Sequence, residues 1–398
     1  MLLFAHNTTL FSTDTRITFM KTWDIFCRVV DNYGDIGVCW RLARQLANEY
    51  PFQVRLWVDE LEALRRIWPS ASNIDRQILE GIEVCRWYSI FDETTAITNV
   101  VIEAFACELP EFYIAAMAKQ KKMGNQPYWF NLEYLSAEPW VEECHGLFSM
   151  HPQTGLKKAF FFPGFTAKTG GLLREQHLLA ERDSFLTSSQ TAIQWLAAKG
   201  INRTADSLLI SLFTYENKAI SSLLTAWQTG TAPITCLVPE GRTLTSINNS
   251  LSLQLQTGDK LSLGQLQLIV IPFLNQQDYD RLLWACDLNF VRGEDSFVRA
   301  QWAAKPLVWH IYPQDDGAHI IKLNAFLDEY TKTMEPALAQ LTRQLWLAWN
   351  HEQDCAADWN QTIEHYQNWR KHSQNWSQHL NSLGDLASNM VQFCQKTL

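Results

Sequence analysis

The fold is decided first by residues 23–46, which read WDIFCRVVDNYGDIGVCWRLARQL. An apolar strand pattern comes first, a turn with two carboxylates follows, and apolar residues then recur at helical spacing. Such a strand, turn and helix is typical of an open α/β sheet, which binds its ligands at the carboxyl ends of its strands. Asp31 and Asp35 lie in that turn, so we expect both carboxylates at the mouth of a ligand site.

The same turn permits two other interpretations. An aspartate beside asparagine and glycine often forms an Asx-turn or caps a helix, and neither role needs a ligand. Gly34 and Gly37 also suggest a glycine-rich nucleotide loop, although the first glycine of the dinucleotide fingerprint is absent from the sequence. From this segment alone the three interpretations stay open.

Composition indicates a soluble globular protein of two domains. The chain has 398 residues, and at about 150 residues per domain two to three domains are expected, of which we favour two. A net charge of -9 argues against a protein that binds nucleic acid through its phosphates. Apolar runs fall short of the roughly 18 residues that span a bilayer, so we expect no membrane association. Nine cysteines without a Cys-x-x-Cys pair indicate free thiols in a reducing cytoplasm.

Strand and helix patterns place two α/β domains in series. They alternate from the first strand onward and restart at Leu208, which predicts two parallel sheets covered by helices. We expect a disordered extension over 1–19, with Met20 an alternative translation start. Two Rossmann-like domains at 20–185 and 206–370 follow, and then a C-terminal helix at 371–398, for which a return onto the first domain is one option.

Two further segments are expected to carry no chemistry. The polar stretch from Thr243 to Gly258 predicts a surface excursion rather than core. The C-terminal helical region is rich in tryptophan, and tryptophans at such spacings usually pack inside the protein. These residues are Trp346, Trp349, Trp359, Trp369 and Trp376.

A second set of candidate residues follows the strands of the second domain. The run from Arg292 to Ser296 comes directly after a strand and opens a helix, where free backbone N–H groups suit a diphosphate. Its Glu, Asp and Ser are equally suited to capping that helix without a ligand. At other strand ends, aromatic and amide side chains suit a nucleobase and a phenol suits a phosphate oxygen. These residues are Phe213, Tyr215, Phe273, Gln276 and Tyr312.

Five motifs together resemble the EarP family, protein-arginine rhamnosyltransferases that modify translation elongation factor P. They read DNYGDIG at 31–37, EYLSAE at 133–138, GF at 164–165 with TGGL at 169–172, RGEDSFVRAQ at 292–301 and WHIYPQ at 309–314. The resemblance runs from about Thr22 to the C-terminal helices. One departure is Leu132, which stands before Glu133 where the family pattern has tryptophan, so we expect no stacking role there.

The resemblance implies a GT-B arrangement, with the acceptor on the first domain and dTDP-β-L-rhamnose on the second. L-Rhamnose would pass with inversion to an arginine of elongation factor P and activate that factor for translation of polyproline stretches. By position, Asp35 corresponds to the general base and Asp31 to the acid that supports the acceptor. The donor would be bound by the following residues: Phe213, Tyr215, Phe273, Gln276, Arg292, Glu294, Asp295, Ser296 and Tyr312.

Chemistry of the residues agrees with this implication. A guanidinium has a pKa above about 12 and becomes a nucleophile only when it is held and deprotonated, which two carboxylates can do. We find no histidine cluster of the usual metal-binding kind, so metal independence is expected. Two alternatives remain: a GT-B enzyme with a glycan or lipid acceptor, and a non-catalytic module that binds a nucleotide-sugar or a translation factor.

Overall fold

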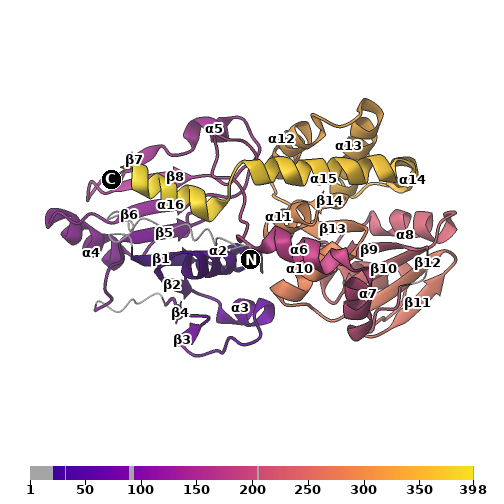
Figure 1. Ribbon diagram of the computed structural model, residues 1–398, viewed down its shortest axis with the longest axis horizontal. Helices are drawn as coiled ribbons and strands as arrows, with labels where there is room; N and C mark the ends of the chain where they lie inside the picture. Colours follow the sequence, from indigo (N-terminus) through magenta and orange to yellow (C-terminus); the bar gives the residue numbers. More distant parts are fainter. Residues whose placement is uncertain (1–20, 32, 89–93, 204–205, 398) are drawn as a thin grey trace, which may run out of the picture.

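The computed structural model describes residues 21–31, 33–88, 94–203 and 206–397. Within these residues the chain forms one eight-stranded and one six-stranded sheet, which belong to two α/β domains lying side by side (Figure 1). The expected α/β class is confirmed. The extension expected at 1–19 and the alternative start Met20 lie outside the described residues.

The N-terminal sheet has the strand order β3-β4-β2-β1-β5-β6-β8-β7. Its inner strands run parallel, while β3 and β7 pair antiparallel at the two edges. The strands are β1 Thr22–Cys27, β2 Gln53–Val58, β3 Arg76–Leu79, β4 Ile82–Arg86, β5 Val100–Ala104, β6 Tyr128–Leu132, β7 Phe148–Met150 and β8 Lys157–Phe161. The helices are α2 Gly34–Glu49, α3 Leu61–Ile67, α4 Glu111–Lys122 and α5 Trp140–Cys144. The central strands are buried along almost their whole length because both faces of the sheet are covered.

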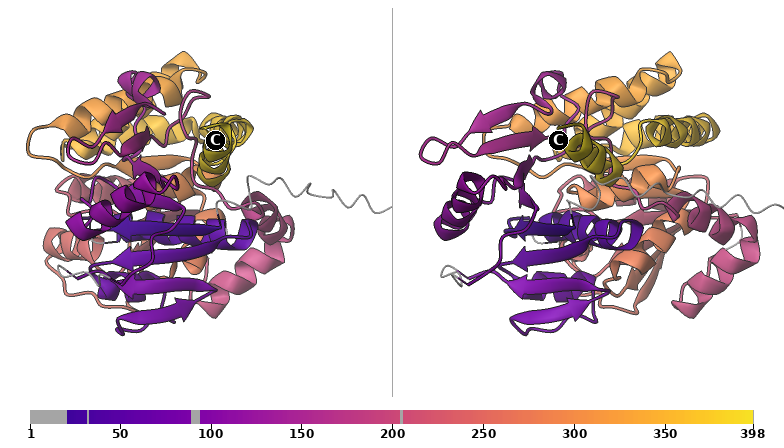
Figure 2. Two further views of the ribbon diagram at one scale, coloured as in Figure 1. Left: turned by 90° about the vertical axis from the view of Figure 1, so that its left-hand side faces the viewer. Right: turned by 60° about the vertical axis from the view of Figure 1, so that its left-hand side comes forward.

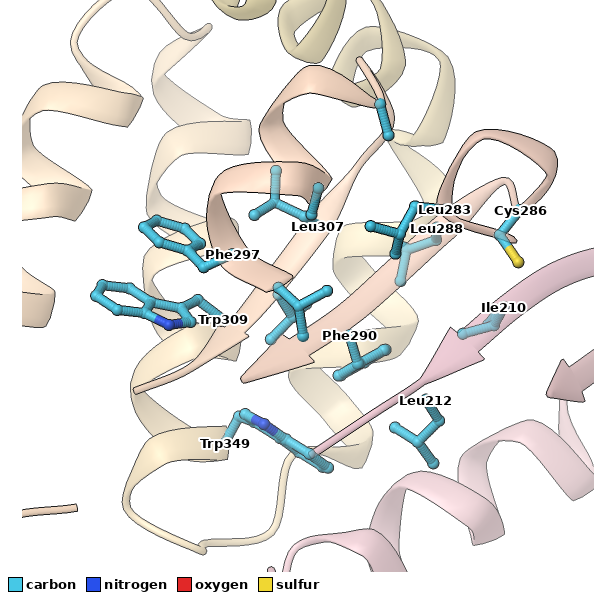
Figure 3. Packing of buried hydrophobic residues seen from close by; sticks show 14 of the residues in the cluster. Ile210, Leu212, Leu283, Cys286, Leu288, Phe290, Phe297, Leu307, Trp309 and Trp349 are labelled. Atoms are coloured by element: carbon cyan, nitrogen blue, oxygen red, sulfur yellow. The ribbon is translucent and has the colours of Figure 1, made fainter. Parts of the chain in front are cut away.

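The C-terminal sheet has the order β11-β12-β10-β9-β13-β14, and only β11 pairs antiparallel among its described strands. Its strands are β9 Leu208–Leu212, β10 Ile234–Pro239, β11 Lys260–Leu263, β12 Leu266–Ile271, β13 Leu288–Arg292 and β14 Leu307–His310. Its helices, with the two that precede it, are α6 Leu178–Thr187, α7 Ser189–Ala198, α8 Ile220–Thr229, α9 Arg242–Leu251, α10 Gln276–Ala285 and α11 Asp295–Trp302. In the core, the rings of Phe297 and Trp309 stack with centroids 3.9 Å apart (Figure 3). This packing fixes α11 on β14 and so fixes the turn between β13 and α11.

The segment expected to be a surface excursion contains helix α9, so that prediction is wrong in part. Thr243 and Ile247, four residues apart, are buried on one face of this helix. The Thr243 hydroxyl accepts from the Thr214 N–H at 2.8 Å and donates to the Thr214 carbonyl at 3.0 Å. Two buried positions anchor an otherwise polar helix, and its polar composition concealed them.

The C-terminal helices cover the second domain and then return to the first. They are α12 Ala318–Thr331, α13 Pro336–Asn350, α14 Ala356–Glu364, α15 Tyr366–Ser382 and α16 Leu386–Thr397. The five tryptophans expected to be packing residues are buried. Beyond α15 the chain turns at Gly384, where φ is +82°, and α16 returns to the N-terminal domain (Figures 1 and 2). Its Leu386 and Met390 pack into the N-terminal core. None of the helices in the described part of the chain has the length and apolar character needed to cross a bilayer.

A buried ion network joins the two domains. Arg41 of α2, only 1% exposed, donates its Nε to Asp295 at 2.7 Å and both its terminal nitrogens to Asp280 at 2.9 and 3.0 Å. Arg299 of α11 binds the same Asp280 carboxylate at 3.0 and 2.7 Å and reaches Glu175 at 2.6 Å. Because each buried charge has partners of opposite sign, the network holds α2 of the first domain against α10 and α11 of the second.

Removing one member of this network leaves buried charge without its partner. We therefore expect Arg41→Met to lower the free energy of unfolding by about 3 to 5 kcal/mol. The matched control is Arg281→Met, which breaks the exposed ion pair with Asp278 and should cost at most about 1 kcal/mol. Urea denaturation followed by tryptophan fluorescence measures both values. Equal losses in the two variants would show that the network does not stabilise the protein.

Candidate active site

Two strand-to-helix turns meet where the domains face each other. The turn from β1 to α2 carries Asp31 and Asp35, and the turn from β13 to α11 carries Gly293 and Glu294. Gly293 has φ +59°, and a Cβ atom there would lie 2.9 Å from both the Asp31 carboxylate and the Tyr215 hydroxyl. A side chain at this position would therefore be strained and would collide with the opposing carboxylate.

Asp35 lies inside the first turn of α2 and its carboxylate points back toward β1. Its Oδ2 accepts from the Val30 N–H at 2.7 Å and from the Asp31 N–H at 2.9 Å, while Tyr33 is the N-cap residue. Burial raises the pKa of Asp35 above its usual range, and the two N–H donors oppose this rise. The alternative of a helix-capping aspartate is therefore wrong for Asp35.

Asp31 reaches across to the opposite domain. Its Oδ2 accepts from the Tyr215 hydroxyl at 2.6 Å, so this bond joins the two walls of the site. Burial raises the pKa of Asp31, while Tyr215 and the positive charge of Arg292 oppose the rise. The Asp31 side chain therefore makes a bond between domains rather than a local Asx-turn.

Two adjoining cavities lie between the domains, and Asp31, Gly34, Gly293 and Glu294 line both. The first encloses about 640 Å³ and holds most of the expected donor-site residues. These residues are Phe213, Tyr215, Phe273, Gln276, Arg292, Glu294, Asp295 and Ser296. The second encloses about 810 Å³ and contains Asp35 and Tyr312. All the candidate residues thus lie in one continuous site.

Two polar side chains in the first cavity have free binding capacity. The Gln276 amide nitrogen donates to the Gly37 carbonyl at 3.0 Å, whereas its buried Oε1 has no hydrogen-bond partner among the described residues. The Arg292 guanidinium lies 4.4 and 4.9 Å from the ring centroids of Phe213 and Tyr215, and no described carboxylate is within ion-pair distance of it. Burial lowers the pKa of Arg292. Gln276 thus offers a buried acceptor without a described partner. Arg292 offers a half-buried guanidinium that donates to the Thr214 carbonyl at 3.2 Å but pairs with no described carboxylate, and the two together suit a polar, anionic ligand.

Besides Tyr215, three more of the expected donor-site residues have partners within the protein. Asp295 binds Arg41, and the Ser296 hydroxyl accepts from the Arg292 N–H at 3.0 Å and donates to the Arg292 carbonyl. The Phe273 ring packs against Tyr33 of the first domain, with centroids 5.1 Å apart. These side chains shape the cavity through contacts that the sequence pattern does not reveal.

Glu294 also spans the two domains. Its Oε2 accepts from the Leu135 N–H of the first domain at 3.0 Å. Burial raises the pKa of Glu294 to about 7, with the Leu135 N–H and Lys322 acting in the opposite direction. This carboxyl group therefore changes its charge near neutral pH, directly beside Asp31 and Asp35.

The cavities are also lined by residues to which no pattern in the sequence had given a role, among them Phe105, Tyr134, Tyr279 and Lys322. Tyr134 was quoted as part of a motif, and its position just after a buried strand was an available signal. In the described part of the chain, no group of three or more His, Cys, Asp and Glu side chains is placed to hold a metal ion.

The chain is similar to known proteins in both sequence and fold. The family pattern of the elongation factor P rhamnosyltransferase EarP matches residues 23–395. The protein-arginine rhamnosyltransferase of Pseudomonas aeruginosa is 48% identical over 376 residues, which cover 94% of this chain and 99% of that protein. The enzyme of the same name from Pseudomonas putida is 47% identical over 379 residues, covering 95% of this chain and 99% of that one.

A structure solved for EarP-mediated arginine glycosylation of translation elongation factor EF-P superposes with a TM-score of 0.69 at 36% identity, covering 95% of this chain and 99% of that one. MurG of Acinetobacter baumannii superposes with a TM-score of 0.50 at 12% identity, covering 94% of this chain and 99% of that one, and shares the fold alone. The expected GT-B arrangement of two Rossmann-like domains is confirmed.

Proposed function

The chain belongs to the EarP family of elongation factor P rhamnosyltransferases, and from that premise we propose that it transfers L-rhamnose from dTDP-β-L-rhamnose to an arginine of elongation factor P. One observation carries the chemistry. Asp31 and Asp35 of the first domain share a continuous site with the unpartnered Gln276 Oε1 and the unpaired Arg292 of the second. A base and an anion site therefore face the same space.

The first cavity is suited to the nucleotide of the donor. Phe213 and Phe273 supply aromatic walls for a pyrimidine, and the free Gln276 Oε1 is an acceptor for the N3–H of thymine. The Arg292 guanidinium and the first N–H groups of α11 supply positive charge for the diphosphate. The Tyr312 hydroxyl, in the second cavity, is a further donor toward a phosphate oxygen.

Asp35 is the general base in this proposal. Two backbone N–H groups hold its Oδ2, so Oδ1 is the oxygen that receives a proton. A nitrogen of the arginine attacks C1 of the sugar, the C1–oxygen bond to the diphosphate breaks, and the nitrogen's proton passes to Asp35. The leaving dTDP takes the electron pair of the broken bond. A single displacement of this kind inverts the β linkage to α.

Asp31 supports the acceptor in this reaction. In the free protein its Oδ2 is bound by the Tyr215 hydroxyl, which keeps the carboxylate at the boundary of the two cavities. From there it can bind a guanidinium N–H and localise electron density on the attacking nitrogen. The modified factor would serve translation of polyproline stretches, and the reaction would take place in the cytoplasm. No described cysteine forms a disulfide bond, which suits a reducing compartment.

Incubation of elongation factor P with this protein and dTDP-rhamnose should add the mass of one deoxyhexose to an arginine. Asp35→Asn should lower kcat by about 10² to 10⁴-fold because the base is lost, while donor affinity stays within about threefold. Intact-mass spectrometry and calorimetry measure the two quantities. Asp75→Asn, which changes an exposed carboxylate bound to Arg86 and Tyr88, is the matched control and should retain its rate.

The outcomes separate the alternatives. Donor binding without any mass gain would exclude elongation factor P as acceptor and favour another glycan or lipid acceptor. Unchanged transfer by Asp35→Asn would exclude Asp35 as the base. Donor binding with no turnover on any acceptor would favour a non-catalytic module.

Charge on the leaving diphosphate is neutralised by protein groups in this proposal, so we expect transfer without a metal ion. Excess EDTA should leave the rate unchanged. A rate that falls with EDTA and returns with added Mg²⁺ would contradict this expectation.

A further inference from the structure

The second cavity is acidic. Among its described lining residues, Asp31, Asp35 and Glu294 supply three carboxyl groups and Lys322 supplies one ammonium group. Asp35 is the most enclosed of the carboxylates, at 3% exposure. A cavity with this balance of charge attracts a cation.

An aromatic pair forms one wall of this cavity. The rings of Phe105 and Tyr134 stack with centroids 4.4 Å apart and planes 19° from parallel. The Lys322 Nζ lies 5.7 Å from the Tyr134 ring centroid, so this ring already has a cation over it. Tyr134 is still 38% exposed, and its ring therefore has free surface for a ligand.

A strained backbone segment positions the Phe105 ring of this pair. Phe105 has φ +56° and its neighbour Ala106 has φ +52°, a left-handed conformation that costs on the order of 1 kcal/mol or more for a residue with a side chain. The Phe105 N–H donates to the Leu132 carbonyl at 2.7 Å, and the Ala106 N–H donates to the buried Asn131 side chain at 3.2 Å. The surrounding strands thus impose a conformation that places the Phe105 ring against Tyr134.

The Tyr134 hydroxyl reaches the base itself. It lies beside the Asp35 carboxylate and favours its ionised form, while the Val30 and Asp31 N–H groups hold Oδ2 of that carboxylate. One residue therefore presents an aromatic face to the cavity and a hydroxyl to the group that accepts the proton.

We propose that Tyr134 is the positioning residue of the acceptor subsite: its ring is the wall on which the arginine guanidinium stacks, and its hydroxyl orients the Asp35 carboxylate toward that guanidinium. This inference rests on the function proposed above. Phe105 supports the ring, and the Lys322 ammonium occupies the cation position until the acceptor enters.

Loss of the Tyr134 hydroxyl should shift the pH dependence of kcat/KM in one direction. The Tyr134 hydroxyl favours the ionised form of Asp35 and so lowers the pKa of that carboxyl, and we expect its removal to raise the pKa. Because the base acts only when ionised, the acidic limb of kcat/KM must move to higher pH in Tyr134→Phe. The other charged or titratable groups that face Asp35 stay in place in that variant: Cys27, Asp31, Cys39 and Glu294, with Lys322 in the same cavity.

Two variants separate ring from hydroxyl. Tyr134→Phe should lower kcat by about 3- to 10-fold, the worth of one hydrogen bond, with acceptor KM within about twofold and the acidic limb shifted upward. Tyr134→Leu should in addition raise acceptor KM by about 10-fold, because the arginine guanidinium loses the aromatic ring on which it stacks. Tyr88→Phe is the matched control: this exposed tyrosine also donates to a carboxylate, Asp75, and its loss should change nothing.

A binding measurement keeps this inference separate from the proposed function. Saturation-transfer NMR with N-acetyl-arginine amide reports guanidinium binding without turnover, and the wild type and Tyr134→Phe should bind this probe more strongly than Tyr134→Leu. Probe binding of this pattern with no rhamnose transfer would overturn the proposed acceptor chemistry and leave the subsite standing. Equal probe binding by all three proteins, or an unmoved acidic limb in an active Tyr134→Phe, would overturn the inference.

Discussion

The site depends on one buried guanidinium, that of Arg41, which lies between Asp280 and Asp295 of the opposite domain. It emerges from α2 less than two turns after Asp35, and Asp295 is the first residue of α11. The ion pair therefore brings the beginnings of two helices together. Together with the Tyr215–Asp31 and Leu135–Glu294 hydrogen bonds, it sets the separation between the turn that carries the base and the turn that faces the diphosphate.

Close approach of the two helices has further requirements that the chain meets. A Cβ atom on Gly37 would lie 3.1 Å from the Asp295 carboxylate, so glycine gives the needed space. Each helix start carries partial positive charge, which favours the carboxylates and anionic ligands gathered there. Burial at the same place raises the pKa values of Asp31, Asp35 and Glu294. Burial between the two domains therefore both fixes the positions of these carboxyl groups and shifts their pKa values.

Residue patterns predicted the two parallel sheets and the strand-end position of nearly every candidate residue, because parallel strands end at a common edge. The roles of these residues came from resemblance to a family, not from spacing. Contacts between distant segments could not be predicted. Asp295 binds Arg41 across 254 residues of chain, and the left-handed backbone at Phe105 has no glycine to signal it. For the same reason Tyr134, whose neighbours come from separate segments, was quoted in a motif but given no role.

The central claim is that the Arg41 contact sets the distance between base and donor. Its most direct test is the single-turnover rate of rhamnose transfer by Arg41→Met with donor already bound, measured under conditions where the variant is folded. We expect donor affinity within about threefold of wild type and a transfer rate lower by at least about 10-fold, because a displacement near 1 Å is enough for such a loss. An undiminished rate in the folded variant would contradict the account, since base and donor would then be aligned without the contact.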